Sequence, residues 1–387
     1  MKNRVAIAYS FNDRDWLGGK NYFASLFGAI SAIQPQNLEF VLVTGMKTDT
    51  TLPDDFPWLK VIRTTWMDRL NPLWLLRQIT LRISGTDPLF ERFLAYHNID
   101  ILSHSGPLRC GSHIKTLPWL YDFQFMHLPQ YWAPKHIRWA EQRYAAACRH
   151  GDGLILSSHD AASDLQKFAP WCSLPRHVLQ FVSNPVDFSK IVKKDTLKKK
   201  YDLPDTYFYL PNQFWTNKNH RLVIDALLIL RAQGQKVNVI CTGKTFDGRR
   251  PKYFDELMSY CEQQGLTDEF RVLGVVPYLD LQSLMAHACA VINPSRFEGW
   301  SSTVEEAKTL HRRLLLSDIA VHREQSPKNA NYFGVDDAPE LARLLMVCAE
   351  EDQHEVSEEE VCTDYIYRLK EFGQNYLNVI RSTLQES

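Results

Sequence analysis

The sequence lacks paired cysteines and long apolar runs. Its eight cysteines are scattered without a Cys-x-x-Cys or another paired spacing, so we expect neither a disulfide framework nor a zinc site, and a reducing compartment is the simple interpretation. No stretch of about 18 apolar residues is present, so no helix is expected to span a bilayer. The apolar run VAIAYS near the start is soon interrupted by charges, which predicts no signal-peptide core. We therefore expect a cytoplasmic protein whose membrane contact, on the cytoplasmic face of the inner membrane, is at most peripheral.

Charge of one sign is also lacking. The formal net charge is −1 over 387 residues, so nothing in the overall balance favours nucleic acid as a partner. At 45% hydrophobic residues, the chain can bury sizeable cores, and its length suits two domains.

Apolar strand patterns alternate with helical patterns along the chain, which predicts α/β domains with parallel sheets. In the first half the strands are expected at residues 5–10, 40–44, 61–64, 99–103 and 116–121. In the second half they are expected at residues 207–210, 237–242, 270–273, 290–293 and 314–316. We expect a first domain at residues 1–182, completed by a terminal helix at residues 365–387, and a second domain at residues 183–364.

Residues 290–309, AVINPSRFEGWSSTVEEAKT, combine a strand, a turn and the start of a helix. Pro294 and Gly299 end the strand, and Ser301, Ser302 and Thr303 are three successive candidates for the helix N-cap. The unpaired N–H groups and the positive dipole end of such a helix favour an anion such as a diphosphate.

Two carboxylates accompany this turn. Glu298 lies in it, and Glu306 follows within the helix after seven intervening residues. From there Glu306 could accept hydrogen bonds from vicinal hydroxyls such as those of a ribose. The alternative is that Glu305 and Glu306 are first-turn acids on a solvated helix face.

Two further stretches suggest phosphate contacts. Gly18 and Gly19 are expected in a loop between the first strand and a helix at residues 22–33, where glycine would let the backbone approach a ligand, although a plain turn needs the same residues. Lys218 stands at the head of a helical pattern at residues 222–232, beyond a strand end, where it could act as a point charge for phosphate.

Residues 66–83, WMDRLNPLWLLRQITLRI, mix apolar side chains with Arg69, Arg77 and Arg82. A basic amphipathic helix of this kind can lie on an anionic membrane. The alternative, which the sequence favours, is a core-packed helix whose arginines reach solvent along its surface.

The order of strand, Pro-Ser, Glu298-Gly299, Glu306-Ala307 and the following strand at 314–316 resembles the donor-site signature of glycosyltransferase family 4, whose members are retaining enzymes of the GT-B fold. The longer string FEGWSSTVEEAKTLHRRLLLSDIAVHREQSP is similar to the subgroup that builds bacterial surface polysaccharides and lipopolysaccharide. The resemblance is clear over residues 211–327. It implies two Rossmann-like domains facing across a cleft, a last helix that returns to the first domain, and sugar transfer without a bound metal or cofactor.

The resemblance also assigns roles to residues. It implies that Glu298 lies near the donor sugar, that Glu306 binds the ribose, and that the backbone at Val275 contacts the nucleotide base. The implied catalytic set is Glu298, Lys218, Asp122 and His127. The implied donor-binding set is Gly18, Gly19, Gln213, Thr242, Gly243, Val275, Arg296, Gly299, Ser301, Ser302, Thr303 and Glu306.

This chain departs from the family pattern at two points. Related enzymes pair the lysine with an arginine a few residues earlier, where this chain has Asn212 and Gln213, so Arg296 or Arg221 would have to compensate. The family histidine next to the acceptor is also displaced. Tyr121 and Phe125 occupy the usual positions, while Asp122 and His127 are retained nearby, and His127 could serve as a base or only cap a loop.

The expected function is transfer of a hexose from a nucleotide-diphosphate sugar to a glycan or lipid-linked saccharide. The subgroup favours GDP-mannose as donor, with UDP-sugars second. Two alternatives remain: an epimerase, which would form product without an acceptor, and a regulatory protein that binds a nucleotide sugar without turnover.

Overall fold

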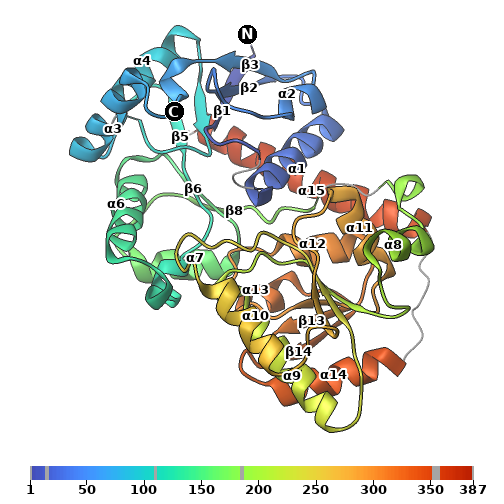
Figure 1. Ribbon diagram of the computed structural model, residues 1–387. Coiled ribbons are helices and arrows are strands. Elements are labelled where there is room, and N and C mark those ends of the chain that lie inside the picture. The colour runs from blue at the N-terminus through green and yellow to red at the C-terminus, as the bar shows by residue number, and fades with distance from the viewer. Residues whose placement is uncertain (1, 14–16, 109–110, 184–186, 351–357, 386–387) are drawn as a thin grey trace. The chain divides into compact units, whose positions relative to one another are not determined.

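A computed structural model describes residues 2–13, 17–108, 111–183, 187–350 and 358–385. The chain forms two compact units (Figure 1). Unit 1 comprises Met1–Phe123, Pro134–Asn184 and Tyr367–Ser387, and unit 2 comprises Gln124–Ala133 and Pro185–Ile366. The last helix, α15 (Glu358–Gln385), contributes its second part to unit 1.

Unit 1 contains a five-stranded parallel sheet in the order β3-β2-β1-β4-β5 and a small parallel sheet in the order β6-β7-β8. The larger sheet consists of β1 (Asn3–Tyr9), β2 (Leu38–Thr44), β3 (Lys60–Arg63), β4 (Ile101–Ser103) and β5 (Lys115–Leu117). The smaller one consists of β6 (Trp119–Leu120), β7 (Leu154–Leu156) and β8 (Arg176–Val178). The helices are α1 (Leu17–Ile33), α2 (Leu52–Asp55), α3 (Pro72–Ser84), α4 (Pro88–Tyr96), α6 (Pro134–His150), α7 (His159–Phe168) and the second part of α15, with a short 3-10 helix η1 (Thr65–Met67).

Both faces of the larger sheet in unit 1 are covered, because successive strand residues point to opposite sides. On one face Ala6 and Val41 pack with Phe90 and Leu94 of α4. On the other, α15 approaches α1 closely: a Cβ added at Gly373 would lie 2.8 Å from the carbonyl oxygen of Ala29. A side chain there would force the two helices apart.

Two sequence-based expectations are wrong in unit 1. The single strand expected at residues 116–121 is two strands in different sheets, β5 and β6, with Pro118 between them. Proline lacks the N–H that would continue a ladder, so the strand ends there. Gly18 and Gly19, expected in a loop, lie in the first turn of α1, where the helix already begins at Leu17.

Unit 2 contains a six-stranded parallel sheet in the order β11-β10-β9-β12-β13-β14. Its strands are β9 (Phe208–Leu210), β10 (Val239–Cys241), β11 (Phe270–Val272), β12 (Val291–Asn293), β13 (Leu314–Ser317) and β14 (Ala330–Phe333). Its helices are α5 (Gln124–His127), α8 (Lys194–Tyr201), α9 (His220–Ala232), α10 (Tyr253–Gln263), α11 (Tyr278–His287), α12 (Ser302–Thr309), α13 (Ala320–Gln325), α14 (Ala338–Glu350) and the first part of α15, with 3-10 helices η2 (Pro129–Tyr131), η3 (Phe188–Lys190) and η4 (Thr216–Lys218).

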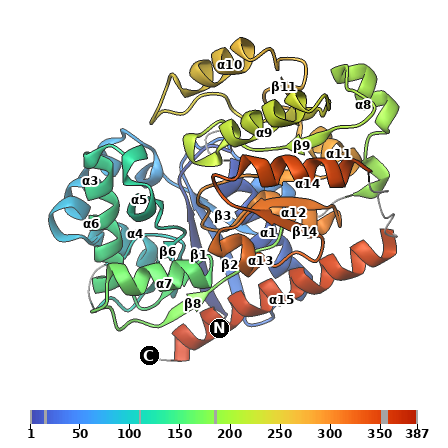
Figure 2. The same cartoon turned by 90° about the horizontal axis from the view of Figure 1, so that it is seen from below.

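The sheet of unit 2 also has two apolar faces. Phe208 and Leu210 point to the side of α9, α10 and α14, three helices that are labelled in Figure 2. Tyr207 and Tyr209 point to the side of α8, α11 and α12. The strand order reverses between β9 and β12, because β10 and β11 lie on one side of β9 and the later strands lie on the other. Ligands of open α/β sheets bind beyond the carboxyl ends of strands at such a reversal.

The predicted α/β class with two Rossmann-like units is confirmed. Among the helices in the described ranges, none has the length and apolar character that crossing a bilayer would require.

Candidate active site

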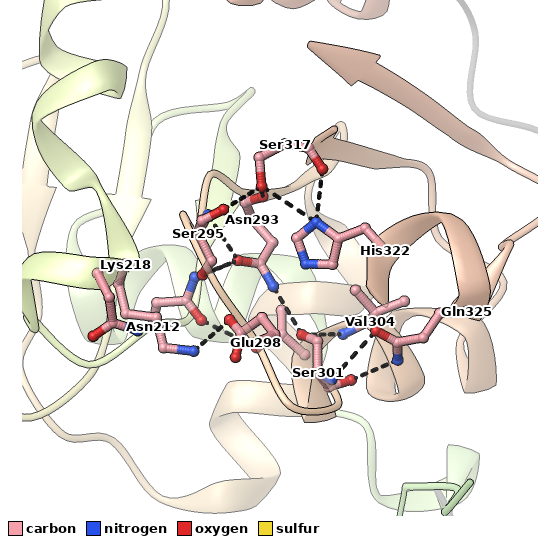
Figure 3. A network of polar contacts seen from close by, with 12 residues as sticks. Asn212, Lys218, Asn293, Ser295, Glu298, Ser301, Val304, Ser317, His322 and Gln325 are labelled. Carbon is pink, nitrogen blue, oxygen red and sulfur yellow. Dashed lines mark hydrogen bonds and ion pairs between the residues drawn. The ribbon is translucent and has the colours of Figure 1, made fainter. Parts of the chain in front are cut away.

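Polar side chains meet where the strand order of unit 2 reverses. Asn293 ends β12, and Asn212 follows β9 by two residues. Asn212 Nδ2 donates to Asn293 Oδ1 at 3.0 Å (Figure 3). Thr303 Oγ1 of α12 donates to Asn212 Oδ1 at 3.2 Å. All three residues are buried. These bonds hold the ends of two neighbouring strands against the start of α12.

Ser301 caps α12, as one of the three predicted candidates. Its Oγ accepts from the backbone N–H of Val304 at 3.4 Å and from Asn293 Nδ2 at 2.8 Å. The first N–H groups of a helix have no partner within it, so those of Ser302 and Thr303 remain available at its positive dipole end. The geometry suits an anion.

Gln325 of α13 fixes this helix start from the other side. Its Oε1 accepts from the N–H of Ser301 at 3.2 Å, while its Nε2 donates to the Ser301 carbonyl and to Glu305 Oε1, each at 2.9 Å. Lys308 Nζ adds an ion pair with Glu305 at 3.1 Å. Glu305 is buried. The alternative that Glu305 and Glu306 line a solvated face is therefore wrong.

Lys218 and Glu298 form a largely buried ion pair. Lys218 Nζ lies 2.5 Å from Glu298 Oε1, and the two side chains are 15% and 10% exposed. Lys218 ends η4, and Asn219 takes a left-handed conformation, with φ of 57°, before α9 begins at His220. The turn places a cation beside the loop between β12 and α12.

His322 of α13 lies close enough to Glu298 for an electrostatic interaction between them. Its Nδ1 hydrogen-bonds the carbonyl oxygen of Ser317 at 2.8 Å, which assigns the proton to Nδ1. Burial lowers the pKa of His322, and the negative charge of Glu298 opposes that shift. Its Nε2 is a buried acceptor with no hydrogen-bond partner among the described residues. A hydroxyl group of a ligand would provide one.

Glu306 is a buried carboxyl group on α12. Burial raises its pKa to about 7, and the hydroxyl of Tyr278, which donates to its Oε1 at 3.2 Å, partly opposes the shift. A carboxyl group held this way is half ionised near neutral pH. It has acceptor capacity left for the hydroxyls of a ligand.

The arginines considered as substitutes for the missing family arginine are each paired elsewhere. Arg296 Nη2 lies 2.5 Å from Asp336 Oδ1. Arg221 lies 2.9 Å from Asp225 Oδ1, and its guanidinium stacks 3.3 Å from the centre of the Tyr260 ring. Both pairs lie on partly exposed side chains.

Arg249 is a cation that the sequence did not single out. Its Nη2 donates to Asn217 Oδ1 at 3.3 Å, in the residue before Lys218, and its guanidinium lies 5.0 Å from the ring centre of Trp215. Asp247 pairs with it at 3.1 Å. Arg249 thereby fixes the turn that carries Lys218.

The predicted residues that follow β10 and β11 lie close together. Thr242 is buried, and its Oγ1 shares a hydrogen bond of 2.7 Å with the hydroxyl of Tyr209. The N–H of Gly243 donates to the carbonyl of Gly274 at 2.9 Å. Gly243 has φ of 143°, and a Cβ there would lie 2.5 Å from the carbonyl oxygen of Asn212. Its first role is to let two loops approach, and any contact with a donor stays a prediction. Val275, beside Gly274, is exposed.

Other predicted donor residues line the same loops. Gln213 is partly exposed, and its carbonyl accepts from the N–H of Trp215 at 2.7 Å. Gly299 lies in the turn between Glu298 and Ser301, with intermediate exposure.

The remaining predicted residues belong to other segments of the chain. Gly18, Gly19 and Asp122 belong to unit 1. The carbonyl of Asp122 accepts from the hydroxyl of Tyr144 at 2.8 Å. His127 belongs to the short segment grouped with unit 2, where its exposed ring lies 4.9 Å from that of Phe297.

In the described ranges, no group of three or more His, Cys, Asp and Glu side chains is arranged to hold a metal ion. The metal-free reaction that the sequence suggests stays a prediction.

Sequence reasoning missed Asn293, His322, Gln325, Tyr278 and Arg249. Asn293 carried a detectable signal: it is a polar residue at the carboxyl end of a predicted strand, like Asn212 just after the neighbouring one. The others come from distant segments whose approach no local pattern indicates.

A model of a known protein family matches the part of the chain that contains this site. Residues 193–355 match the family model described as glycosyl transferases group 1. The match contains the Asn212–Asn293 network, Lys218, Glu298 and the whole of α12. It supports the prediction of a glycosyltransferase. No curated protein sequence matches the chain.

Solved structures show the same fold. A glycosyltransferase from Rickettsia africae is similar with a TM-score of 0.67 and 14% identity, covering 100% of both chains. HepE from Anabaena in complex with UDP and glucose is similar with a TM-score of 0.67 and 14% identity, covering 98% of this chain and 100% of that one. The lipopolysaccharide outer core galactosyltransferase WaaB gives a TM-score of 0.61 and 15% identity, covering 98% of this chain and 99% of that one. These likenesses establish the GT-B fold.

Proposed function

We propose that the protein is a retaining glycosyltransferase of family 4 that transfers a hexose from a nucleotide-diphosphate sugar to a glycan or lipid-linked saccharide in polysaccharide or lipopolysaccharide biosynthesis. One observation carries the proposal: where the strand order of unit 2 reverses, the capped start of α12 lies beside the loop of Glu298, and Lys218 pairs with Glu298.

The diphosphate is the group that this arrangement suits best. The amides of Ser302 and Thr303 provide fixed donors, and Lys218 provides a full positive charge. As the bond to the sugar breaks, negative charge grows on the diphosphate, and preorganised donors stabilise it without reorganisation. Arg249 holds the turn of Lys218 in place. It is thus a positioning residue in this proposal.

The two acidic residues have separate tasks. Glu306 accepts hydrogen bonds from ribose hydroxyls, with Tyr278 orienting its carboxyl group. Glu298, paired with Lys218, faces the sugar and stabilises positive charge at its anomeric carbon. A sugar hydroxyl is proposed to donate a hydrogen bond to the unpartnered Nε2 of His322, because buried acceptors in proteins are normally hydrogen-bonded.

The donor is proposed to be a UDP-hexose, ahead of the GDP-mannose that the sequence favours. The reason is the similarity to a structure that contains UDP and glucose. Val275 and its neighbours are proposed to contact the base. Gln213, Thr242, Gly243, Arg296 and Gly299 complete the donor set, while Gly18, Gly19, Asp122 and His127 are proposed to act on the side of the acceptor and the donor phosphates.

The reaction is proposed to need no metal, and the protein to work in the cytoplasm. A thermal-shift screen of UDP-, GDP- and dTDP-sugars tests the proposal first, since a ligand that binds the native state raises its apparent stability. The stabilising sugar nucleotide is then incubated with and without saccharide acceptors, and the anomeric configuration of the product is determined by NMR. We expect acceptor-dependent release of nucleoside diphosphate and a retained configuration.

Two results would contradict the transferase. Product formed equally well without an acceptor would support an epimerase, and binding without any release would support a regulatory protein. If no sugar nucleotide raised the melting temperature, the assignment of the site would be wrong.

A further inference from the structure

Helix α3 (Pro72–Ser84) in unit 1 carries an apolar face on the outside of the molecule. Five of its aliphatic side chains are between 36% and 82% exposed: Leu73, Leu75, Leu76, Ile79 and Ile83. At 3.6 residues per turn they share one side of the helix. Leu70, just ahead of the helix, adds another aliphatic side chain at 74% exposure. Contiguous exposed apolar surface of this kind marks an interaction site.

The opposite side of α3 is fixed to the protein, so the apolar face cannot turn inward. Arg77 is buried there, with its Nη2 2.7 Å from Asp87 Oδ2, and its guanidinium lies 3.8 Å from the ring centre of Phe90. Its Nη1 also donates to the carbonyl of Trp66 at 2.6 Å. The interpretation of α3 as a core-packed helix with solvent-reaching arginines is therefore wrong for Arg77. The helix presents apolar side chains to both the protein and the solvent.

The charged residues of α3 itself and of the few residues around it, 69–86, all have one sign. Residues 69–86 contain three arginines and no acidic residue, although the chain as a whole has a net charge of −1. Arg69 and Arg82 are exposed beside the aliphatic side chains. Cations that border an exposed apolar face match a surface that is apolar inside and negative at its boundary.

The neighbouring helix α6 is also rich in basic residues and exposes an aromatic side chain. The two helices lie near each other in Figures 1 and 2, and a Cβ added at Gly85, just after α3, would lie 3.2 Å from Ala146 Cβ of α6. Along α6 there are four Lys or Arg side chains and one acid, Glu141. Trp139 is 59% exposed, with the guanidinium of Arg143 5.5 Å from its ring centre. Tryptophan and arginine are typical of the boundary between a bilayer and water.

We propose that α3, supported by α6, docks the protein on an anionic lipid bilayer, with Leu75, Leu76, Ile79 and Ile83 entering the acyl boundary. A second copy of the chain fits less well. An interface formed by α3 with its own copy would bring the flanking arginines of both copies together, and no acid in residues 69–86 would pair with them. This surface is independent of the residues proposed to bind the donor.

Vesicle flotation of the full-length protein tests the proposal. Vesicles of phosphatidylcholine alone are compared with vesicles that contain about one-third phosphatidylglycerol. We expect the protein to float with the anionic vesicles, less with the neutral ones, and less again at high salt, because the arginines contribute an electrostatic part.

Substitutions on the exposed face separate docking from folding. Ile79→Glu and Ile83→Glu should each lower vesicle partitioning by roughly ten- to a hundredfold, which is the value of burying one aliphatic side chain. Their melting temperatures should stay near that of the wild type. Val347→Glu, which changes an exposed apolar residue of α14 that is 38% exposed, is the matched control and should float normally.

Three results would overturn the proposal. The wild type could fail to float with either vesicle, or Ile79→Glu could float as the wild type does. A wild type that elutes as a dimer, that becomes monomeric in Ile79→Glu, and that does not float would assign the face to a second copy. Sugar-nucleotide binding, measured without vesicles, is unaffected by any of these results, so the donor site is judged separately.

Discussion

Lys218 Nζ lies 2.5 Å from Glu298 Oε1, and this bond joins residues that are 80 positions apart in the sequence. It ties the turn before α9 to the loop before α12. Each residue is the counter-ion of the other, but Lys218 is proposed to bind the diphosphate and Glu298 to face the sugar. Substitutions of the two therefore have different expected effects.

Glu298→Gln should reduce turnover strongly while sugar-nucleotide binding persists. The amide keeps the size of the side chain and can still accept from Lys218, but it no longer stabilises positive charge on the sugar. We expect kcat to fall by about a hundredfold or more, with KM changed only a few-fold. Steady-state kinetics check this. Glu340→Gln, a partly exposed carboxylate paired with Arg343, is the control and should leave kcat unchanged.

Ser301→Ala should destabilise the protein by about 1–3 kcal/mol. It removes the cap of α12 and leaves the buried Nδ2 of Asn293 without its acceptor. Denaturant unfolding measures the change. Ser302→Ala, one position later on a partly exposed side chain, should cost less than about half as much. Equal effects of the two substitutions would contradict the assignment of the cap.

Gly243→Ala should lower stability by about 1–3 kcal/mol or more, because its Cβ would lie 2.5 Å from the carbonyl oxygen of Asn212 and its φ of 143° disfavours a side chain. Gly248→Ala provides the comparison, since a Cβ there meets only a side-chain atom of Phe246 at 3.8 Å. The melting temperatures of both variants decide the matter. A harmless Gly243→Ala would mean that the two loops are not packed as described.

Glu306 should make stability fall as the pH rises toward and past neutrality. Its pKa is about 7 in the folded protein and about 4.3 in an unfolded chain. Between these values the folded state binds more protons, so its advantage is complete at low pH and is lost as the pH passes 7. Glu306→Gln removes this contribution and should raise the melting temperature relative to the wild type above pH 7, by an amount worth on the order of a few kcal/mol. Parallel slopes of melting temperature against pH in both proteins would contradict the raised pKa of Glu306.

The local pattern of the sequence predicted the strand, the turn and the capped helix at residues 290–309, because N-cap chemistry depends on residues three positions apart. It could not predict that Gln325 holds Ser301 or that Asn212 meets Asn293, since these contacts join segments 24 and 81 positions apart. The same limit explains α3. Its apolar residues surround the helix, so the sequence cannot tell which side is covered, and only the buried Arg77–Asp87 pair fixes the answer.

The central claim is that the start of α12 and Lys218 bind the diphosphate of a sugar nucleotide, and isothermal titration of Lys218→Ala tests it most directly. Uridine, UMP and UDP are titrated into the wild type, into Lys218→Ala and into Lys236→Ala, the last an exposed lysine of unit 2. If uridine nucleotides do not bind the wild type, the guanosine series replaces them. The account predicts that Lys218→Ala weakens the affinity for UDP by about tenfold or more and leaves the affinity for uridine unchanged. Lys236→Ala should not weaken the binding of UDP. Equal affinity of the diphosphate for the wild type and Lys218→Ala would contradict the account.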